Sequence, residues 1–255
     1  MKIKVAFLPA SPLAIGGDVC IIVDVIRATT AIVALFDAGS DRVFVGGFRT
    51  DVAKSRAAVG ENGVICAELD DGSTPLGFDH EPSPSLLSRL DLSGRFSMLA
   101  TTNGTPAILA AVREGAALIL LGSLRNLDVV ARRALAEASS RNADITIICS
   151  GQLRNSRIAI EDSYCAGMIV SRICELAGHG AVELDDSASL ARGFSISEKS
   201  AVPVLLGSMT GRRFIGNYRQ HDVEFCARVN ESTIVPVVTA GHDIHDHPVY
   251  LLDAQ

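Results

Sequence analysis

The sequence predicts an α/β protein in which a mixed or mostly parallel sheet is flanked by helices. Short apolar runs of strand length alternate with longer helix-like runs along the chain, which favours helices packed on the faces of a sheet. Apolar residues make up 48% of the 255 residues and aromatic residues only 5%, so a core of Ala, Val and Leu is expected. Because no low-complexity linker divides the chain, we expect one domain over residues 1–240 and a C-terminal tail over residues 241–255.

The predicted elements follow from where the apolar runs begin and end. Strands are predicted over residues 2–8, 20–25, 42–46, 63–67, 96–101, 117–122, 144–149 and 233–238. Helices are predicted over residues 29–39, 50–59, 105–115, 124–139, 161–178 and 197–207. The segment 68–84 is rich in Gly, Pro, Asp and Ser and predicts a long loop, and long ordered loops in compact domains are often functional.

A weak internal repeat at an offset of 76 places residues 27–47 over residues 103–123, with Thr29 opposite Thr105 and Gly39 opposite Gly115. Internal duplication and convergent βαβ composition explain it equally well. In both cases, polar strand-to-helix turns occur in equivalent places, and such carboxyl ends of strands are where α/β sheets bind ligands.

Charge and composition exclude several classes of protein. The formal net charge of −6 argues against a general nucleic-acid binder. The start of the chain does not have the pattern of a signal peptide, and no apolar run approaches the ~20 residues of a membrane helix, so we expect a cytoplasmic protein that does not bind membranes. The six cysteines include no CxxC pair, which predicts buried free thiols rather than a zinc site or disulfides.

The first polar turn, residues 24–30, suggests a phosphate site. A helix start presents free N–H groups, to which Arg27 would add a bidentate clamp and Thr29 and Thr30 would add hydroxyl groups. Asp24 would repel a phosphate unless a cation such as Mg²⁺ lay between them. The alternative is an Asp24–Arg27 ion pair with a threonine cap.

Other polar residues follow further predicted strands or begin helices. Each has an ordinary alternative, because Asn and Thr cap helices and acidic residues complement the positive end of a helix. Together they suggest a Mg²⁺-assisted phosphate site made by Glu68, Thr102, Asn103, Gly104, Thr105, Glu161 and Asp162. The signatures of the common phosphatase and nucleotide-binding folds, including D-x-D-x-T, C-x₅-R and the Walker loop, are absent from the sequence.

The motifs V-D-V-I-R-A-T-T, G-F-D followed by S-P, T-T-N-G-T, G-S-L-R-N, E-D-S-Y-C-A-G and D-V-E-F-C occur in this order between about residues 20 and 236. In combination they resemble the 2-phosphosulfolactate phosphatase (ComB-type) family. The resemblance implies an α/β fold unlike the common phosphatases and a Mg²⁺-dependent phosphoric monoester hydrolase. It would convert 2-phospho-3-sulfolactate to sulfolactate and phosphate in coenzyme M biosynthesis.

The resemblance also points to site residues, and the chemistry of their side chains suggests a role for each. Asp24, Glu68, Glu161 and Asp162 would be the Mg²⁺ carboxylates, with Asp24, Arg27, Glu161 and Asp162 as the catalytic group. Phosphate and substrate would be held by Arg27, Thr29, Thr30, Thr102, Asn103, Gly104, Thr105, Arg125 and Asn126. Water attack on phosphorus and carboxylate attack to form a phosphoenzyme both remain open.

Departures from the family pattern concern the substrate. Leu69 replaces a basic residue after Glu68, and Glu81 and Pro82 replace Gly and Asn in the loop before Ser83. The negative charge of Glu81 would be unfavourable near a doubly anionic, sulfonated substrate. We therefore expect the substrate to be either 2-phospho-3-sulfolactate or a related small acidic phosphoester. A non-catalytic phosphometabolite-binding protein and an isomerase or lyase are the rival hypotheses. We expect a homodimer or higher homo-oligomer, and interpret the His-rich stretch 241–250 as a solvated tail or an oligomer contact.

Overall fold

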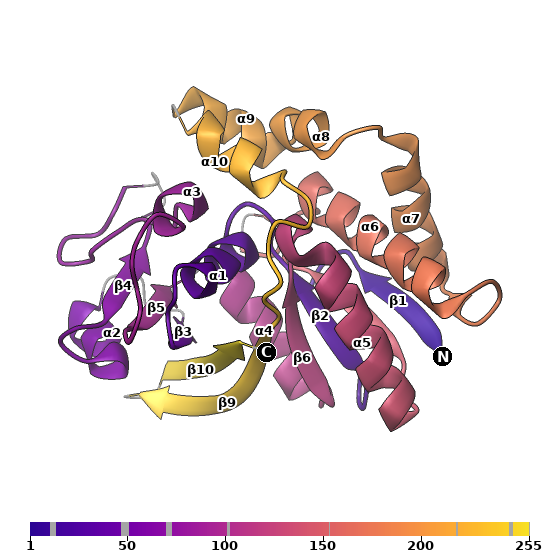
Figure 1. Cartoon of the computed structure of the whole chain (residues 1–255), viewed down its shortest axis with the longest axis horizontal. Coiled ribbons are helices and arrows are strands. Elements are labelled where there is room, and N and C mark those ends of the chain that lie inside the picture. The colour runs from indigo at the N-terminus through magenta and orange to yellow at the C-terminus, as the bar shows by residue number, and fades with distance from the viewer. Residues whose placement is uncertain are drawn as a thin grey trace.

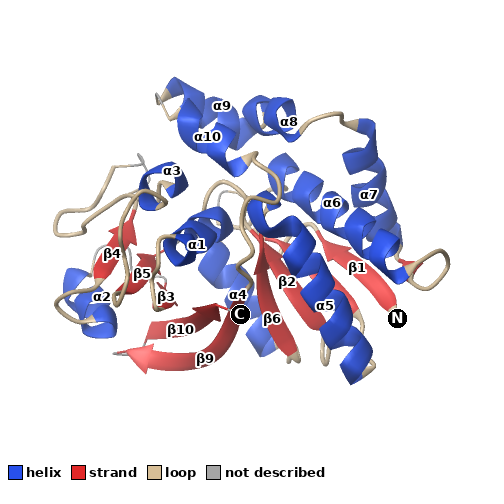
Figure 2. Cartoon of the chain, in the orientation of Figure 1, coloured by secondary structure: helices blue, strands red, loops and turns tan. Residues whose placement is uncertain are grey.

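The computed structural model confirms an α/β fold in which one sheet is flanked by helices (Figure 1 and Figure 2). It describes residues 1–10, 14–46, 51–69, 73–100, 103–152, 154–217, 219–244 and 247–254. The ten strands lie in the order β4-β5-β3-β10-β9-β6-β2-β7-β1-β8. They are β1 (Lys2–Ala6), β2 (Val19–Val23), β3 (Arg42–Gly46), β4 (Val64–Ala67), β5 (Phe96–Ala100), β6 (Leu118–Gly122), β7 (Ile145–Cys149), β8 (Glu183–Leu184), β9 (Pro236–Ile244) and β10 (His247–Ala254).

The sheet consists of two parallel parts joined by an antiparallel hairpin. Strands β4, β5 and β3 pair in parallel, and so do β6, β2, β7, β1 and β8. The β9–β10 hairpin lies between them, with β10 antiparallel to β3 and β9 antiparallel to β6. The predicted boundary at residue 240 is therefore wrong, because the chain beyond it pairs within the sheet instead of forming a tail.

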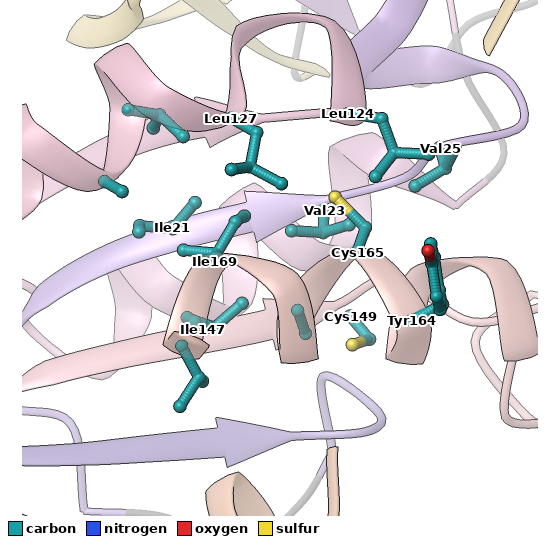
Figure 3. Packing of buried hydrophobic residues seen from close by; sticks show 14 of the residues in the cluster. Ile21, Val23, Val25, Leu124, Leu127, Ile147, Cys149, Tyr164, Cys165 and Ile169 are labelled. Atoms are coloured by element: carbon teal, nitrogen blue, oxygen red, sulfur yellow. The ribbon is translucent and has the colours of Figure 1, made fainter. Parts of the chain in front are cut away.

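Side chains of β2 alternate between two cores. Val19, Ile21 and Val23 belong to the cluster that includes α5 and α6, whereas Cys20 and Ile22 belong to the cluster that includes α1 and α4. Figure 3 shows Ile21 and Val23 packed among residues of β7, α5 and α6. Because β2 is buried on both faces, its sequence is continuously apolar, as expected for a central parallel strand. A third cluster packs α2 against β4 and β5.

The helices include six that correspond to predicted ones and four that do not. The predicted set is α1 (Ala28–Asp37), α2 (Val52–Val59), α4 (Gly104–Arg113), α5 (Leu127–Arg141), preceded by the 3₁₀ turn η1 (Leu124–Asn126), α6 (Ile160–Ala177) and α8 (Ala201–Gly207). The additional helices are α3 (Pro84–Leu87), α7 (Asp186–Ser197), α9 (Met209–Gly216) and α10 (Gln220–Cys226). Helices α8, α9 and α10 lie together at one end of the molecule (Figure 1).

Two further predictions bear on the kind of protein. The six cysteines are free, and all but Cys174 are buried, as predicted. In the described part of the chain, no helix combines the length and apolar character required to cross a membrane.

Candidate active site

The residues predicted to form the site lie largely at the carboxyl ends of β2, β4, β5 and β7. Between them is a polar hollow of about 40 Å³, the site pocket, which has room for a few water molecules or a small ion. The pocket is lined by Asp24, Ile26, Arg27, Ala28, Glu68, Pro82, Ala100 and Asn103.

The turn between β2 and α1 separates the four residues predicted there into two pairs. Asp24 and Arg27 line the site pocket. Thr29 and Thr30 are buried, and their hydroxyls donate to the carbonyl oxygens of Asp24 (2.8 Å) and Val25 (2.7 Å). The Asp24 N–H donates in return to Thr29 Oγ1 at 3.1 Å. The threonines therefore stabilise the turn and are not among the residues that line the pocket.

Arg27 stands at the N-cap of α1 and is the centre of a charge cluster. Its Nη2 donates to Glu68 Oε2 at 2.5 Å, and its Nη1 donates to Asp222 Oδ2 at 2.8 Å and to Glu81 Oε2 at 3.2 Å. The guanidinium also lies over the Phe214 ring, 4.6 Å from the ring centroid. Burial opposes the charge on Arg27, but Glu68, Asp222 and Glu81 raise its pKa overall. We call Arg27, Glu68, Glu81 and Asp222 the Arg27 cluster.

Asp222, on α10, is the fixed member of this cluster. Its side chain is fully buried, and Oδ1 accepts hydrogen bonds from the hydroxyls of Ser85 (2.6 Å) and Ser83 (2.7 Å). Burial alone would raise the pKa of Asp222, but the hydrogen bonds from Ser85 and Ser83 and the charge of Arg27 together lower it. Asp222 is therefore a permanent anion that joins α10 to Arg27 and to the start of α3.

Asp24, Glu161 and Asp162 form an acidic group beside the pocket. Burial raises the pKa of Asp24 to about 7, with the charges of Glu161 and Glu68 acting in the same direction, while the Ala28 N–H and Arg27 oppose it. Burial also raises the pKa of Asp162, helped by the charges of Asp24 and Glu161. Three carboxyls so placed resist simultaneous ionisation unless a cation is close to them.

The two acidic residues of α6 have different surroundings. Asp162 accepts from the backbone N–H groups of Val25 (2.8 Å) and Gly151 (3.1 Å), so it holds two loops together. Burial raises the pKa of Glu161, although the hydroxyls of Thr210 and Ser208 counteract the effect. Glu161 Oε2 is buried, and no described residue makes a hydrogen bond to it.

The unpartnered Oε2 of Glu161 and the raised pKa of Asp24 are both consistent with a binding site for a divalent cation. Mg²⁺ commonly takes only one or two carboxylates and completes its shell with waters and phosphate oxygens. Within the described ranges, no three or more His, Cys, Asp and Glu side chains form a ready-made metal cage. Of the four predicted ligands, Asp24 and Glu161 fit best, since Asp162 braces backbone and Glu68 binds Arg27.

The start of α4 contributes the predicted amide and glycine. Asn103 is the N-cap residue and lines the site pocket, but its side chain makes no capping hydrogen bond, and its buried Oδ1 has no hydrogen-bond partner among the described residues. Gly104 follows as the first helical residue. Thr105 is buried and donates to the Gly46 carbonyl at 3.2 Å. Thr102 lies outside the described residues.

Arg125 and Asn126 are not brought to the pocket lining. The Asn126 side chain bonds Ser123 in a capping box and donates to the carbonyls of Leu121 (3.1 Å) and Ile234 (2.9 Å). Arg125 binds Glu231 at 2.7 Å and Asp37 at 3.6 Å, and lies over the Phe225 ring. We call Arg125, Asp37 and Glu231 the Arg125 cluster. Arg125 joins the end of α1 to Glu231, and Asn126 joins the end of β6 to Ile234, so the predicted contact with substrate has no support in this geometry.

Sequence reasoning missed the partners of Arg27 on other elements. Asp222, Glu81 and Phe214 had no predicted role, although Asp222 opens the motif D-V-E-F-C and Glu81 was noted as a departure. The place of Asp222 at the start of the motif D-V-E-F-C was the available signal.

Comparisons with known proteins identify the family of the chain. The family model of 2-phosphosulpholactate phosphatase matches residues 9–241. Probable 2-phosphosulfolactate phosphatases from Thermus thermophilus and Deinococcus radiodurans are 32% and 31% identical, the former over 93% of this chain and 94% of its own length, the latter over 96% of both. A relative with the same description from Pseudothermotoga lettingae is 32% identical over 96% of this chain and all of its own length.

Proposed function

Because the chain belongs to the 2-phosphosulpholactate phosphatase family, we propose that it hydrolyses 2-phospho-3-sulfolactate, or a related small acidic phosphoester, to the 2-hydroxy acid and phosphate. One observation of the structure carries the proposal. Asp24, the buried guanidinium of Arg27 and the start of α4 at Asn103 line a single pocket. A phosphoester hydrolase needs these groups, namely donors for phosphoryl oxygens and a carboxylate beside the phosphorus.

The residues of the pocket have distinct proposed roles. Arg27 donates to the phosphoryl oxygens, where negative charge is greatest in the transition state. The N–H groups of the first turn of α4 provide further donors, because the side chain of its N-cap residue, Asn103, makes no capping hydrogen bond. Asp162 keeps the loops after β2 and β7 in position through its two backbone hydrogen bonds.

We include Mg²⁺ in the proposal, held by Asp24 and Glu161, with Glu68 and Asp162 as the further carboxylates nearby. The unpartnered Glu161 Oε2 and the raised pKa of Asp24 support it. When bound, Mg²⁺ supplies charge neutralisation at the phosphoryl oxygens and lowers the pKa of a coordinated water.

Hydrolysis breaks the bond between phosphorus and the ester oxygen and forms a bond from phosphorus to a water oxygen. The departing alkoxide takes a proton and becomes the hydroxyl group of the 2-hydroxy acid. Two routes are open, direct attack by water and attack by Asp24 followed by hydrolysis of the phosphoenzyme. Rapid acid quench and mass measurement separate them, because only the second route forms a covalently phosphorylated protein.

Release of inorganic phosphate from 2-phospho-3-sulfolactate, with Mg²⁺ and with excess chelator, tests the proposal. We expect release that the chelator abolishes and added Mg²⁺ restores. Release only from another acidic phosphoester keeps the reaction and changes the substrate. If folded protein releases phosphate from no ester in a panel of small monoesters, the proposal fails and the alternative, a non-catalytic phosphometabolite-binding protein, takes its place.

The biological setting is part of the same proposal. We place the reaction in coenzyme M biosynthesis in the cytoplasm, and the family whose model matches the chain supports this setting. A homodimer or larger homo-oligomer is supported by the exposed apolar side chains of Ile158, Ile160 and Leu190, which line one apolar hollow. Light scattering of the purified protein measures this directly.

A further inference from the structure

Glu81 lies where two arginines converge. Its Oε2 accepts from Arg27 Nη1 at 3.2 Å and from Arg219 Nε at 2.9 Å. Arg27 comes from the β2–α1 turn, and Arg219 comes from the residue before α10, so the two guanidiniums approach the carboxylate from separate segments. Paired guanidiniums are a common arrangement for binding carboxylate, sulfonate and phosphate groups. Here a carboxylate of the protein itself fills that position.

Among the three carboxylates on Arg27, Glu81 is the one that a ligand displaces most readily. Asp222 is fully buried and held by Ser83 and Ser85, so it stays in place. Glu68 makes the shortest contact with Arg27, at 2.5 Å. Glu81 makes the longest, at 3.2 Å, and its side chain is 23% exposed, about as much as that of Glu68 at 24%. Water can therefore solvate Glu81 when it leaves Arg27.

Hydrogen bonds fix the backbone on both sides of Glu81, whereas its side chain is partly exposed to solvent. The preceding residue is tied to β4, since the Ala67 N–H donates to the His80 carbonyl at 3.1 Å. The Glu81 carbonyl accepts from the Ser83 N–H at 2.8 Å, and the next residue, Pro82, lines the site pocket. Rotation of the side chain alone is enough to move the carboxylate, and the position that it leaves adjoins the pocket.

The balance of charge also favours replacement of the Glu81 carboxylate by an acidic group of the substrate. Two guanidiniums and three carboxylates meet here, which leaves one net negative charge on these five side chains. A second acidic group on the substrate can bind only at the cost of strong repulsion while Glu81 stays. When Glu81 moves out, the same group meets two cations and the local charge balance is kept.

We propose that Glu81 is a specificity-determining residue: its carboxylate occupies the position between Arg27 and Arg219 in which the second acidic group of the substrate binds, and that group must displace it. This inference rests on the proposed function, because it concerns the part of the phosphoester that does not react. It follows that Glu81 weakens the binding of phosphoesters that carry a second acidic group much more than the binding of esters whose only acidic group is the phosphate.

The test uses two esters that differ in one group. 2-Phospholactate carries a carboxylate where isopropyl phosphate carries a methyl group. Glu81→Gln is expected to lower the KM for 2-phospholactate about fivefold, the value of a partly exposed charge pair, and to change that for isopropyl phosphate less than twofold. Arg219→Gln should raise the KM for 2-phospholactate only.

Glu231→Gln is the matched control, because Glu231 binds a buried arginine, Arg125, away from the pocket. It should leave both KM values unchanged. Equal changes for the two esters in Glu81→Gln, or no change for either ester in Glu81→Gln and Arg219→Gln, would overturn the inference.

A binding measurement separates this inference from the proposed function. Calorimetric titration with 3-sulfolactate, which has two acidic groups and no phosphate, needs no turnover. Tighter binding to Glu81→Gln than to the wild type supports the inference even if no ester is hydrolysed, and equal or weaker binding overturns it even if hydrolysis is observed. A melting temperature close to that of the wild type shows that the variant is folded.

Discussion

The Arg27 cluster and the Arg125 cluster are built alike and lie in different settings. In each, a buried arginine follows one of two adjacent parallel strands, β2 or β6, and lies over a phenylalanine ring. Each arginine binds more than one carboxylate, and each has a buried Nε without a hydrogen-bond partner. Helix α10 serves both, with Asp222 bound to Arg27 and Phe225 under Arg125.

The difference lies in what surrounds the guanidinium. Arg27 lines the site pocket beside Asp24, and its partners include a carboxylate with no access to water. Arg125 joins the end of α1 to the loop after α10, and its partner Glu231 is 45% exposed. A buried arginine with acidic partners is therefore not by itself a sign of function. The start of α4 and the acidic group of Asp24 lie beside the Arg27 cluster and make it a candidate site. The Arg125 cluster instead joins α1 to the loop after α10 and stabilises the fold.

Among the substitutions that test this comparison, Arg27→Gln should have the largest effect on stability and activity. It leaves the buried Asp222 carboxylate without its cation, and losing one partner of a buried pair typically costs about 3–5 kcal/mol of unfolding free energy. Phosphate release should also be lost. Urea denaturation at pH 7 measures the first effect. A loss below about 1 kcal/mol would show that Ser83 and Ser85 suffice to hold the Asp222 charge.

Asp24→Asn should abolish activity and stabilise the metal-free protein at alkaline pH. The pKa of Asp24 is about 7 in the folded state against ~3.9 in an unfolded chain, so the folded state binds this proton more tightly. The unfolding free energy of the wild type should therefore fall as pH rises from about 4 to about 7 and remain reduced above that, by roughly 1–3 kcal/mol.

Denaturation in chelator at pH 5 and pH 8 tests this prediction. The fall between the two pH values should be smaller in Asp24→Asn, and added Mg²⁺ should reduce it in the wild type. An equal fall in both proteins would assign the effect to Glu161 and Asp162, whose pKa values are raised in the same direction.

Arg125→Gln makes the equivalent change in the Arg125 cluster. Because Asp37 and Glu231 have access to water, the loss of their cation should cost only about 1–2 kcal/mol of unfolding free energy. We expect kcat/KM for phosphate release to change less than about threefold. A tenfold rise in KM at unchanged stability would instead place Arg125 in the substrate site.

Thr30→Val should have the smallest effect. The Thr30 hydroxyl donates to the Val25 carbonyl at 2.7 Å within the turn, so its loss should cost about 1 kcal/mol of unfolding free energy. Kinetic constants should stay close to the wild type. If kcat/KM fell tenfold while stability were unchanged, Thr30 would contact the phosphate as the sequence suggested.

Much of the fold was predictable because its signals are local. Continuous apolar runs mark β2, β6 and β7, and each ends in a polar turn that starts a helical segment. Strand β10 was missed because its segment contains His, Asp and Pro. Its strand conformation depends on pairing with β3 and β9. Strand β3 is distant in the sequence, and β9 belongs to the same C-terminal segment as β10.

The candidate site was predictable where a single turn forms it. Asp24, Arg27 and Asn103 were identified from polar residues at strand ends, and all three line the site pocket. Thr29 and Thr30 were assigned to the phosphate because the sequence does not reveal which hydroxyls the backbone uses. Their geometry became clear only from the bonds that close the turn.

The sequence by itself determined the alternation of strands and helices and the polar residues at strand ends, since both depend on neighbours within a few residues. Only the tertiary structure decided which charges meet. Glu81 lies 54 residues from Arg27 along the chain, and Asp222 lies 195 residues away. Their contacts depend on how the loop after β4 and helix α10 pack over the start of α1. Burial there removes water and turns separate charges into one coupled cluster.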